Sequence, residues 1–326
     1  MSPPAPLPRR RRLLCALGAG WALPWVAGCG APPPALRLGA QVFPGYELLY
    51  LARELGQLDT ALVRLVDMPS ASASLRALGA GALEAACLTL DEVLAARDLG
   101  VPLTVVMVFN VSMGADVLLA QPGVAAIQGL RGLRVGVEAT AVGALMLDAA
   151  LQAGGLPLDA VRVVPLAADE HERAFRAGRV DALVTYDPMR QRLLAAGAQP
   201  LFSSRDSPGL VLDVLAVRSD RLAAQRPAVA AAVRAHLAAR QAFVAEPAAH
   251  AARLAPRLGL AAAEVPAAFA GLELPDRARN QALLGAAEGV AASARRLHAV
   301  MRRAGLLQGG FDATGLVDAG FVAAAA

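Results

Sequence analysis

The segment Leu36–Gly56, LRLGAQVFPGYELLYLARELG, carries the pattern on which the fold prediction rests. Its first residues alternate between apolar and polar or small side chains, which is the period-two pattern of a strand. Phe43, Pro44 and Gly45 then interrupt the strand, because proline fixes φ and glycine adopts conformations that other residues avoid. From Tyr46 onward apolar residues recur at helical spacing. A strand that leads through a short turn into a helix N-terminus is where open α/β sheets bind small ligands, so this turn is a candidate wall of a site.

Residues 1–35 precede the predicted fold. Four consecutive arginines are followed by the apolar run Leu13–Gly28, which is too short to span a membrane comfortably and is typical of a secretory signal. The run ends in Val26-Ala27-Gly28-Cys29, which resembles the bacterial lipobox, in which the cysteine is lipidated. We therefore expect a signal peptide at 1–28, a lipid anchor at Cys29, a tether at 29–35 and a periplasmic location. A plain signal peptide is the alternative, and Sec and twin-arginine export both stay open.

Composition excludes several classes of protein. Two of the three cysteines lie in the predicted signal and lipobox, so Cys87 has no partner for a disulfide and is expected to be a buried core residue. The net charge of +4 depends on the four arginines of the signal, so the mature chain is close to neutral. Its basic residues are all arginines and are spread along predicted helices. The sequence therefore offers no argument for nucleic-acid binding.

Strand and helix patterns alternate from Leu36 to Arg218. Such alternation implies βαβ units and mostly parallel sheets. The expected strands are Leu36–Val42, Leu62–Met68, Ala85–Leu88, Leu103–Phe109, Asp116–Ala120, Arg134–Val137, Val161–Pro165, Ala182–Tyr186, Pro200–Ser203 and Leu212–Arg218. The expected helices between them are Tyr46–Leu55, Ser72–Gly79, Asp91–Leu99, Val142–Ala153, Glu170–Ala177 and Pro188–Ala196. A helical tail follows, with Pro227–Val244, Ala248–Leu258, Ala262–Leu272 and one long helix at Arg277–Leu307.

One pattern occurs twice in the α/β region. Residues 79–86 and 177–183 both read as a helix end, a glycine, an apolar residue, an acid and a buried strand. Thr89 and Asp91 follow the first of these strands, and Tyr186 and Asp187 follow the second. This repetition predicts two similar lobes that face one another.

The same residues resemble a known family, the periplasmic substrate-binding proteins of ABC importers, in the group that includes sulfonate, nitrate and thiamine-precursor (NMT1-like) binders. The resemblance covers about Leu36 to Leu307. It is carried by FPGYELLYLARELG, LRALGAGALEAA, TLDEVL, GADVLLA, LRGLRVGVE, AGRVDALVTYDP and VLDVLAVR.

The resemblance implies a two-lobed periplasmic-binding-protein fold of type II. Each lobe would be a mostly parallel sheet flanked by helices, with residues 36–113 and 213–326 in the first lobe, which includes the helical tail, and 114–212 in the second. The likeliest crossing segments are Gly114–Ala120 and Val211–Arg218. The implied ligand-binding residues are Phe43, Pro44, Gly45, Tyr46, Ser70, Ser72, Thr89, Asp91, Asp116, Glu138, Thr140, Val142, Gly143, Tyr186, Asp187 and Asp213. The serines, Thr89 and Asp91 can equally be helix caps, and the two tyrosines either sandwich a flat ligand or pack at the rim.

Charge is the clue to the ligand. A sulfonate or nitrate site needs cations or several backbone N–H groups, whereas the implied positions supply five acids and no arginine. Burying an anion beside unpaired carboxylates is unfavourable, so we expect a nitrogenous ligand such as a pyrimidine or an amidine. A sulfonate or nitrate ligand stays open if the acids cap helices, or if Arg76, Arg131 or Arg134 pair with them.

Three functions compete. The first is a monomeric, non-catalytic lipoprotein that binds a small molecule and delivers it to an ABC permease, with no cofactor or metal. The second is an enzyme of pyrimidine synthesis, which uses a cysteine-rich motif and histidines; this chain has one cysteine in the fold, and its four histidines are scattered without metal-ligand or triad spacing. The third is a membrane-anchored sensor or adaptor. We expect the first.

Overall fold

A computed structural model describes residue 2 and residues 34–138, 141–207, 209–285 and 289–325. The predicted signal, Cys29 and Thr140 therefore lie outside the described residues. From Pro33 onward the chain forms one compact unit. Within the described part of the chain, no helix combines the length and the apolar character that a membrane crossing requires.

The first sheet has the strand order β11-β4-β10-β3-β1-β2. Strands β1, β2 and β3 are mutually parallel, and β10 runs antiparallel to both β3 and β4, so β4 has the direction of the first three. The expected mostly parallel sheet is confirmed, with β10 inserted in the opposite direction and β11 added at the edge. The bounds are β1 Leu36–Ala40, β2 Val63–Asp67, β3 Ala85–Thr89, β4 Leu103–Ser112, β10 Leu212–Arg218 and β11 Leu272–Glu273.

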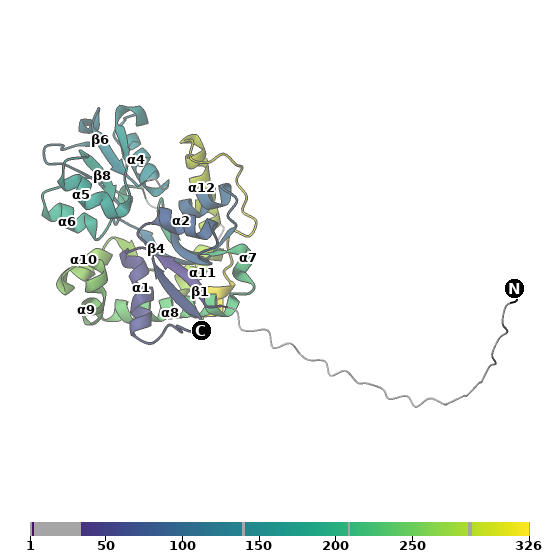
Figure 1. The fold of residues 1–326 in the computed structure, drawn as a ribbon. Coiled ribbons are helices and arrows are strands. Elements are labelled where there is room, and N and C mark those ends of the chain that lie inside the picture. Colours follow the sequence, from purple (N-terminus) through teal and green to yellow (C-terminus); the bar gives the residue numbers. More distant parts are fainter. Residues whose placement is uncertain (1, 3–33, 139–140, 208, 286–288, 326) are drawn as a thin grey trace. The chain divides into compact units, whose positions relative to one another are not determined.

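The second sheet has the order β7-β6-β8-β5-β9. Strands β6, β7 and β8 are parallel, and β5 runs antiparallel to both β8 and β9. The chain passes from the first sheet to the second after β4 and returns between β9 and β10, and Figure 1 shows β6 and β8 in a different part of the molecule from β1 and β4. The bounds are β5 Val117–Ala120, β6 Arg134–Val137, β7 Arg162–Pro165, β8 Ala182–Thr185 and β9 Gln199–Ser203. The lobe boundaries at 113/114 and 212/213 stay a prediction.

The pattern that occurs twice in the sequence has a structural counterpart in both sheets. In each sheet an ion pair lies where the parallel strands begin. In the first sheet Arg37 Nε donates to Glu84 Oε2 at 3.0 Å, and its Nη2 donates to Gly81 O at 2.8 Å. In the second, Arg134 Nε donates to Asp181 Oδ2 at 3.0 Å, and its Nη2 donates to a glycine carbonyl at 2.8 Å. Each acid immediately precedes a central strand, β3 or β8, so each pair joins two neighbouring strands at the same edge.

Helices flank both sheets and largely match the predicted positions. The helices are α1 Pro44–Glu54, α2 Ala71–Gly79, α3 Leu90–Asp98, α4 Ala141–Ala153, α5 His171–Arg176, α6 Met189–Ala195, α7 Ser219–Leu222, α8 Arg226–Ala245, α9 Pro247–Leu258, α10 Val265–Phe269, α11 Arg277–Gly285, α12 Val290–Arg303 and α13 Gly320–Ala323. The expected single helix at Arg277–Leu307 is wrong, because Gly289 has an extended backbone (φ −83°, ψ −152°) and α12 begins after it. The edge strand β11 was not predicted, since two residues carry no periodicity.

Apolar side chains form cores on the faces of both sheets. Around the first sheet they include fully buried residues of β3, β4 and β10 together with α1, α8 and α9. The second sheet has one core on its α4 face, with Met146 and Leu147, and another on its α5 and α6 face, with Phe175 and Leu193. The prediction that Cys87 is a buried residue is confirmed, since it has no exposed surface.

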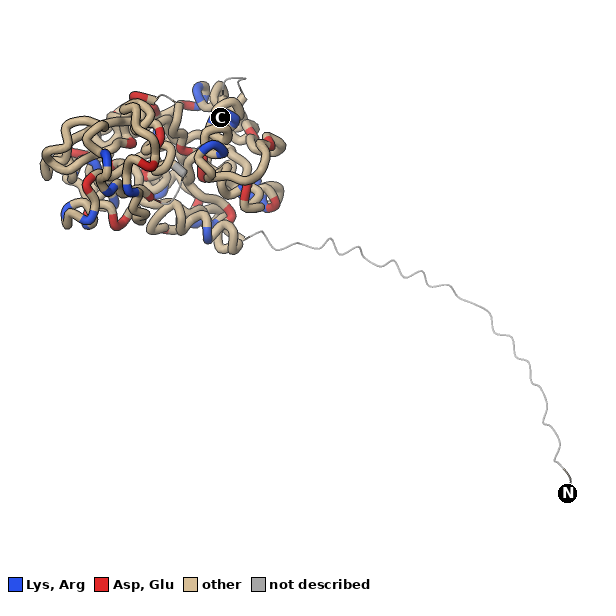
Figure 2. The backbone as a smooth tube through the Cα atoms, turned by 90° about the horizontal axis from the view of Figure 1, so that it is seen from above, with Lys and Arg blue, Asp and Glu red and all other residues tan. Residues whose placement is uncertain are grey.

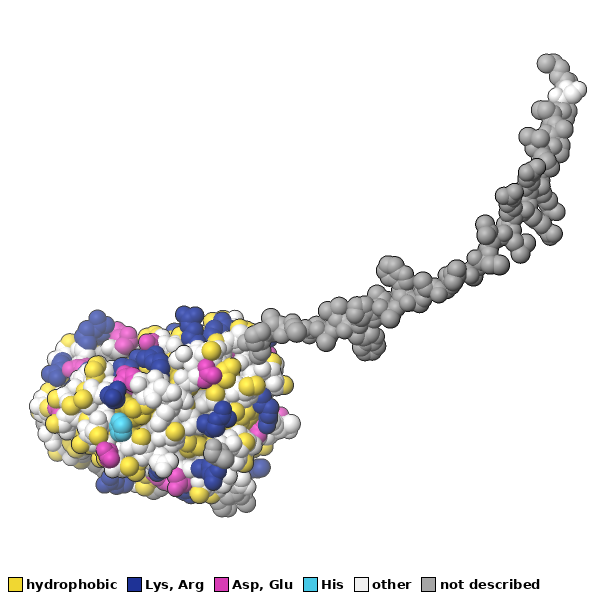
Figure 3. Space-filling view, turned by 90° about the horizontal axis from the view of Figure 1, so that it is seen from below, with side chains coloured by type: hydrophobic (Ala, Val, Ile, Leu, Met, Phe, Trp, Pro, Cys, Tyr) yellow, Lys and Arg dark blue, Asp and Glu magenta, His cyan; other side chains and the backbone are white. Residues whose placement is uncertain are grey.

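Charged residues of both signs are spread over the described part of the chain. Figure 2 shows arginines and acids scattered over the coloured backbone, and the face in Figure 3 shows both signs among apolar side chains. Many of them are paired, as in Arg279 with Glu273 and Arg226 with Asp318.

Candidate functional site

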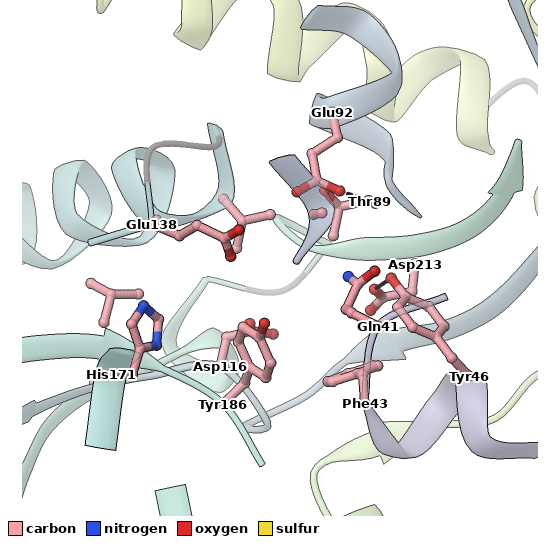
Figure 4. A pocket seen from close by; sticks show the side chains of 14 residues that line it. Gln41, Phe43, Tyr46, Thr89, Glu92, Asp116, Glu138, His171, Tyr186 and Asp213 are labelled. Carbon is pink, nitrogen blue, oxygen red and sulfur yellow. Dashed lines mark hydrogen bonds between the residues drawn. The ribbon is translucent and has the colours of Figure 1, made fainter. Parts of the chain in front are cut away.

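A cavity with a volume of about 40 Å³ lies where the ends of strands from both sheets meet. This is room for about three water molecules, so a larger ligand enters only if the two sheets and their helices move apart. The side chains converge from many elements of the chain (Figure 4). The lining residues are Gln41, Phe43, Tyr46, Ala71, Thr89, Glu92, Asp116, Glu138, Val142, Gly143, His171, Val184, Tyr186 and Asp213.

One wall is built around Asp213 on β10. Its carboxylate accepts a hydrogen bond from the Tyr46 hydroxyl, and its Oδ2 accepts one from Asn110 Nδ2 at 2.6 Å. Asn110 lies on β4 and also reaches the first turn of α1, where a Cβ on Gly45 would collide with the Asn110 side-chain oxygen. The glycine of the FPGY turn therefore lets α1 approach the sheet closely enough for Tyr46 to reach Asp213.

Helix N-termini supply further parts of the wall. Ser70 caps α2 by accepting from Ala73 N at 3.2 Å, which places Ala71 at the cavity. Glu92 accepts from the backbone N–H of Thr89 at 2.8 Å in the capping box of α3. Because the first turn of a helix carries partial positive charge, these ends partly offset nearby carboxylates.

The other wall comes from the second sheet. Glu138 follows β6, and its Oε1 accepts from the hydroxyl of Ser72, on α2 beside the first sheet, at 3.5 Å. A Cβ on Gly143 would lie 2.8 Å from the Glu138 carbonyl oxygen, so a glycine is needed for α4 to pack on this turn. Asp116 precedes β5, and among the described residues its Oδ2 has no hydrogen-bond partner.

Burial and mutual repulsion raise the pKa values of the cavity acids. Burial, with repulsion from Glu92, raises the pKa of Glu138 to about 8. Burial raises the pKa of Asp116 to about 6 and that of Asp213 well above its usual range, in the second case with repulsion from Asp116. Within the described part of the chain, no arginine lines this cavity. A bound cation would relieve this repulsion.

An aromatic row lies along the cavity. The Phe43 ring contacts Tyr46 with centroids 5.0 Å apart and contacts Tyr186 at 5.6 Å in an edge-on arrangement. Phe43 therefore joins the two tyrosines into one apolar surface. The sequence suggested a different arrangement, in which the two tyrosine rings face each other across a flat ligand. A flat ligand can lie against this row while polar groups reach its edge.

Several implied site residues lie off the cavity. Asp91 has no exposed surface, and Asp187 is bound by Arg190, with 2.9 Å between Nη2 and Oδ2. Ser70 and Ser72 lie behind the lining as a helix cap and a partner of Glu138. Pro44 and Gly45 form the start of α1 and do not line the cavity. Conversely, five residues line the cavity that the sequence did not predict there: Gln41, Ala71, Glu92, His171 and Val184.

Metal binding has no support in the described part of the chain, where no group of three or more histidine, cysteine or acidic residues is placed to hold an ion. Cys87 is equally unsuited to nucleophilic chemistry. It is buried in β3, and burial raises the pKa of its thiol.

The sheet topology and the cavity between two sheets define a protein with the periplasmic-binding-protein fold. The profile of the NMT1-like family matches residues 30–259, which is more than half of the chain. The chain belongs to the NMT1-like family. No curated protein matches it.

Solved structures share the fold at low sequence identity. The alkanesulfonate-binding protein SsuA from Xanthomonas axonopodis pv. citri, bound to MOPS, superposes with a TM-score of 0.75 at 20% identity, covering 89% of this chain and all of that one. The periplasmic aliphatic sulphonate binding protein SsuA from Escherichia coli gives 0.69 at 21%, covering 85% and 94%. The desulfurization enzyme DszB gives 0.65 at 18%, covering 89% and 98%. Binding proteins and an enzyme therefore use this fold.

Proposed function

We propose that this protein is the non-catalytic, monomeric solute-binding component of an ABC importer, which captures a small molecule in the cavity and delivers it to a membrane permease. The family and the fold support this proposal. The small cavity supports closure around the ligand, with the lobes 36–113 plus 213–326 and 114–212 separating about the two connections between the sheets.

The ligand in this proposal is a cationic or nitrogen-rich compound of the pyrimidine or amidine kind, similar to a thiamine precursor. One observation carries it: carboxylates reach the cavity from both sheets, at Asp213, Glu92, Asp116 and Glu138, and no described arginine lies with them. The acids would accept hydrogen bonds from ligand nitrogens, and the aromatic row would hold its flat face.

A thermal-shift screen of the purified protein tests this function. The panel contains pyrimidines, amidines, polyamines, alkanesulfonates and nitrate. A ligand that binds only the folded state stabilises it by mass action. At a ligand concentration one hundred times Kd, the free energy of unfolding rises by about 2.7 kcal/mol, and the melting temperature rises with it. We expect a shift with pyrimidines or amidines. If no compound of the panel shifted the melting temperature, the result would contradict the proposal and favour a sensor or adaptor.

A sulfonate ligand is the second candidate, because helix N-termini reach the cavity at Ala71, Thr89 and Val142. Backbone N–H groups at such ends bind anions. This requires the buried acids to be protonated, a form that the raised pKa values of Glu138, about 8, and Asp116, about 6, favour together only below about pH 6. A thermal shift with alkanesulfonates alone would select this candidate.

We further propose that the chain is exported and lipid-anchored at Cys29 in the periplasm. The sequence around Cys29 supports this placement. Cys29→Ser is expected to move the protein from the membrane fraction to the soluble fraction after cell lysis. A variant that stays in the membrane fraction would contradict lipid anchoring without affecting the ligand proposal.

A further inference from the structure

His171 is a cavity residue with a hydrogen-bonding atom that no described residue of the protein uses. It is the first residue of α5, lines the cavity and is 1% exposed. Its Nδ1 lies 3.2 Å from the hydroxyl oxygen of Thr185. Its Nε2 is buried and has no hydrogen-bond partner among the described residues. A buried polar atom without a partner costs about 1–3 kcal/mol, and a ligand in the cavity can supply the partner.

The imidazole is uncharged when it faces a ligand. Burial lowers the pKa of His171 to about 4, although Asp169 and Glu170 on the preceding turn oppose this shift. Figure 4 shows His171 on the side of the cavity where Glu138 lies, and Tyr46 and Asp213 on the other side. The described cavity lining therefore offers a ligand two kinds of polar group. Carboxylates lie at several points, and the neutral imidazole of His171 lies at this end.

We propose that His171 is a specificity residue, whose Nε2 hydrogen-bonds an uncharged polar group of the ligand while the carboxylates bind its cationic nitrogen. The inference rests on the proposed function and narrows the ligand class to molecules with two unlike polar groups, such as an amidine or amine joined to a hydroxyl or a ring nitrogen. The hydroxyl of Thr185 can donate to or accept from Nδ1, so Nε2 serves as an acceptor or a donor accordingly.

The test compares benzamidine with its 3-hydroxy and 4-hydroxy derivatives by calorimetry on the purified full-length protein. All three carry the same amidinium, and a hydroxyl can both donate and accept, so either tautomer of His171 can respond. We expect at least one hydroxyl derivative to bind about 3- to 10-fold tighter than benzamidine, as one neutral hydrogen bond gives. His171→Phe keeps a flat ring at this position and is expected to abolish that gain, so that the three compounds bind this variant with about equal affinity.

Two further variants separate recognition from packing. His236→Phe is the matched control, because His236 is also buried and neither of its ring nitrogens has a hydrogen-bond partner in the described part of the chain. It packs against Phe109 and is not among the residues that line the cavity. We expect it to keep the gain, and His171→Gln to restore part of it. A gain that survives in His171→Phe, or the absence of any gain in the native protein, overturns the inference. Failure of benzamidine itself to bind would instead contradict the proposed ligand class.

Discussion

The acids at the two ends of the parallel strands differ in ion pairing and in pKa. At the starting ends, Glu84 and Asp181 each pair with an arginine, and the pKa of each carboxyl is lowered. At the finishing ends, Asp213, Asp116 and Glu138 lie in the cavity, where no arginine is found among the described lining residues, and their pKa values are raised. The same residue type therefore has opposite energetic effects at opposite edges of the sheets.

This contrast separates acids that stabilise the fold from acids that serve binding. A carboxylate that is paired in the folded state adds stability, whereas one that is buried without a cation subtracts from it. Residues that subtract stability are expected where a ligand compensates for them. The following substitutions test this division.

The largest effect is expected for Glu138→Gln, which removes one cavity charge and keeps the size of the side chain. Loss of a buried charge partner costs about 2–5 kcal/mol in binding, so the affinity for benzamidine should fall by about a hundredfold, measured by calorimetry. The melting temperature should stay equal or rise. Glu84→Gln is the matched control, with unchanged affinity and a lower melting temperature; equal effects of the two variants on binding would abolish the comparison.

The next effect is a pH dependence. Since a cation binds the ionised form and the pKa of Glu138 is about 8, affinity for benzamidine should rise as pH increases from 6 to 8, by up to about fiftyfold. The stability of the ligand-free protein should change with pH in the opposite direction to the affinity. The folded state holds more protons than the unfolded state between about pH 4.5 and 8, so the melting temperature should fall over this window, less so in Glu138→Gln. Affinity that is flat across this range would show that Glu138 does not contact the cation.

A smaller effect is expected where helices of the two sheets meet. Arg192 on α6 donates through Nη2 to the carbonyls of Leu258 and Gly259 at 2.9 and 2.8 Å, at the end of α9, which packs on α1. If these bonds hold the closed form, Arg192→Ala should weaken binding about tenfold, chiefly through faster dissociation in stopped-flow measurements.

Arg176→Ala provides the control for this contact. Arg176 shares the partner Glu172 with Arg192, and no bond from its side chain to α9 is seen among the described residues. Its loss should leave dissociation unchanged. A similar acceleration in both variants would assign the effect to Glu172 and not to the contact with α9.

The smallest effect is expected at the starting ends of the strands. The side chains of both Arg37 and Arg134 are more than 40% exposed, so solvent screens each ion pair. Replacing either arginine by alanine should lower the melting temperature by less than about 2 °C in a calorimetric scan and leave ligand affinity unchanged. A change in affinity would mean that this edge of the sheet communicates with the cavity.

The strand and helix pattern of the α/β region could be predicted from sequence because periodicity is local. The break at Gly289 could not, since a glycine inside a helical pattern leaves its backbone conformation open. Phe43, Tyr46, Thr89, Asp116, Glu138, Val142, Gly143, Tyr186 and Asp213 were expected at a site and line the cavity.

The differences between the expected site residues and the cavity lining concern the direction of side chains. Asp187 was expected at the ligand, but Arg190 one turn later binds it, a spacing that the sequence already displays. His171 was not expected at the cavity because a short helix gives too little periodicity to show which face is buried. Glu92 was not expected there either; in the structure it accepts a hydrogen bond from Thr89 N–H and also lines the cavity.

The most direct test of the central claim compares two flat molecules of similar size and opposite charge, benzamidine and benzenesulfonate, by calorimetric titration of the purified protein at pH 8. We predict that benzamidine binds and releases protons, since it binds the ionised cavity acids, and that benzenesulfonate gives no heat of binding. Binding of benzenesulfonate with proton uptake, and none of benzamidine, would contradict the account and show that the cavity acids are held neutral for an anion.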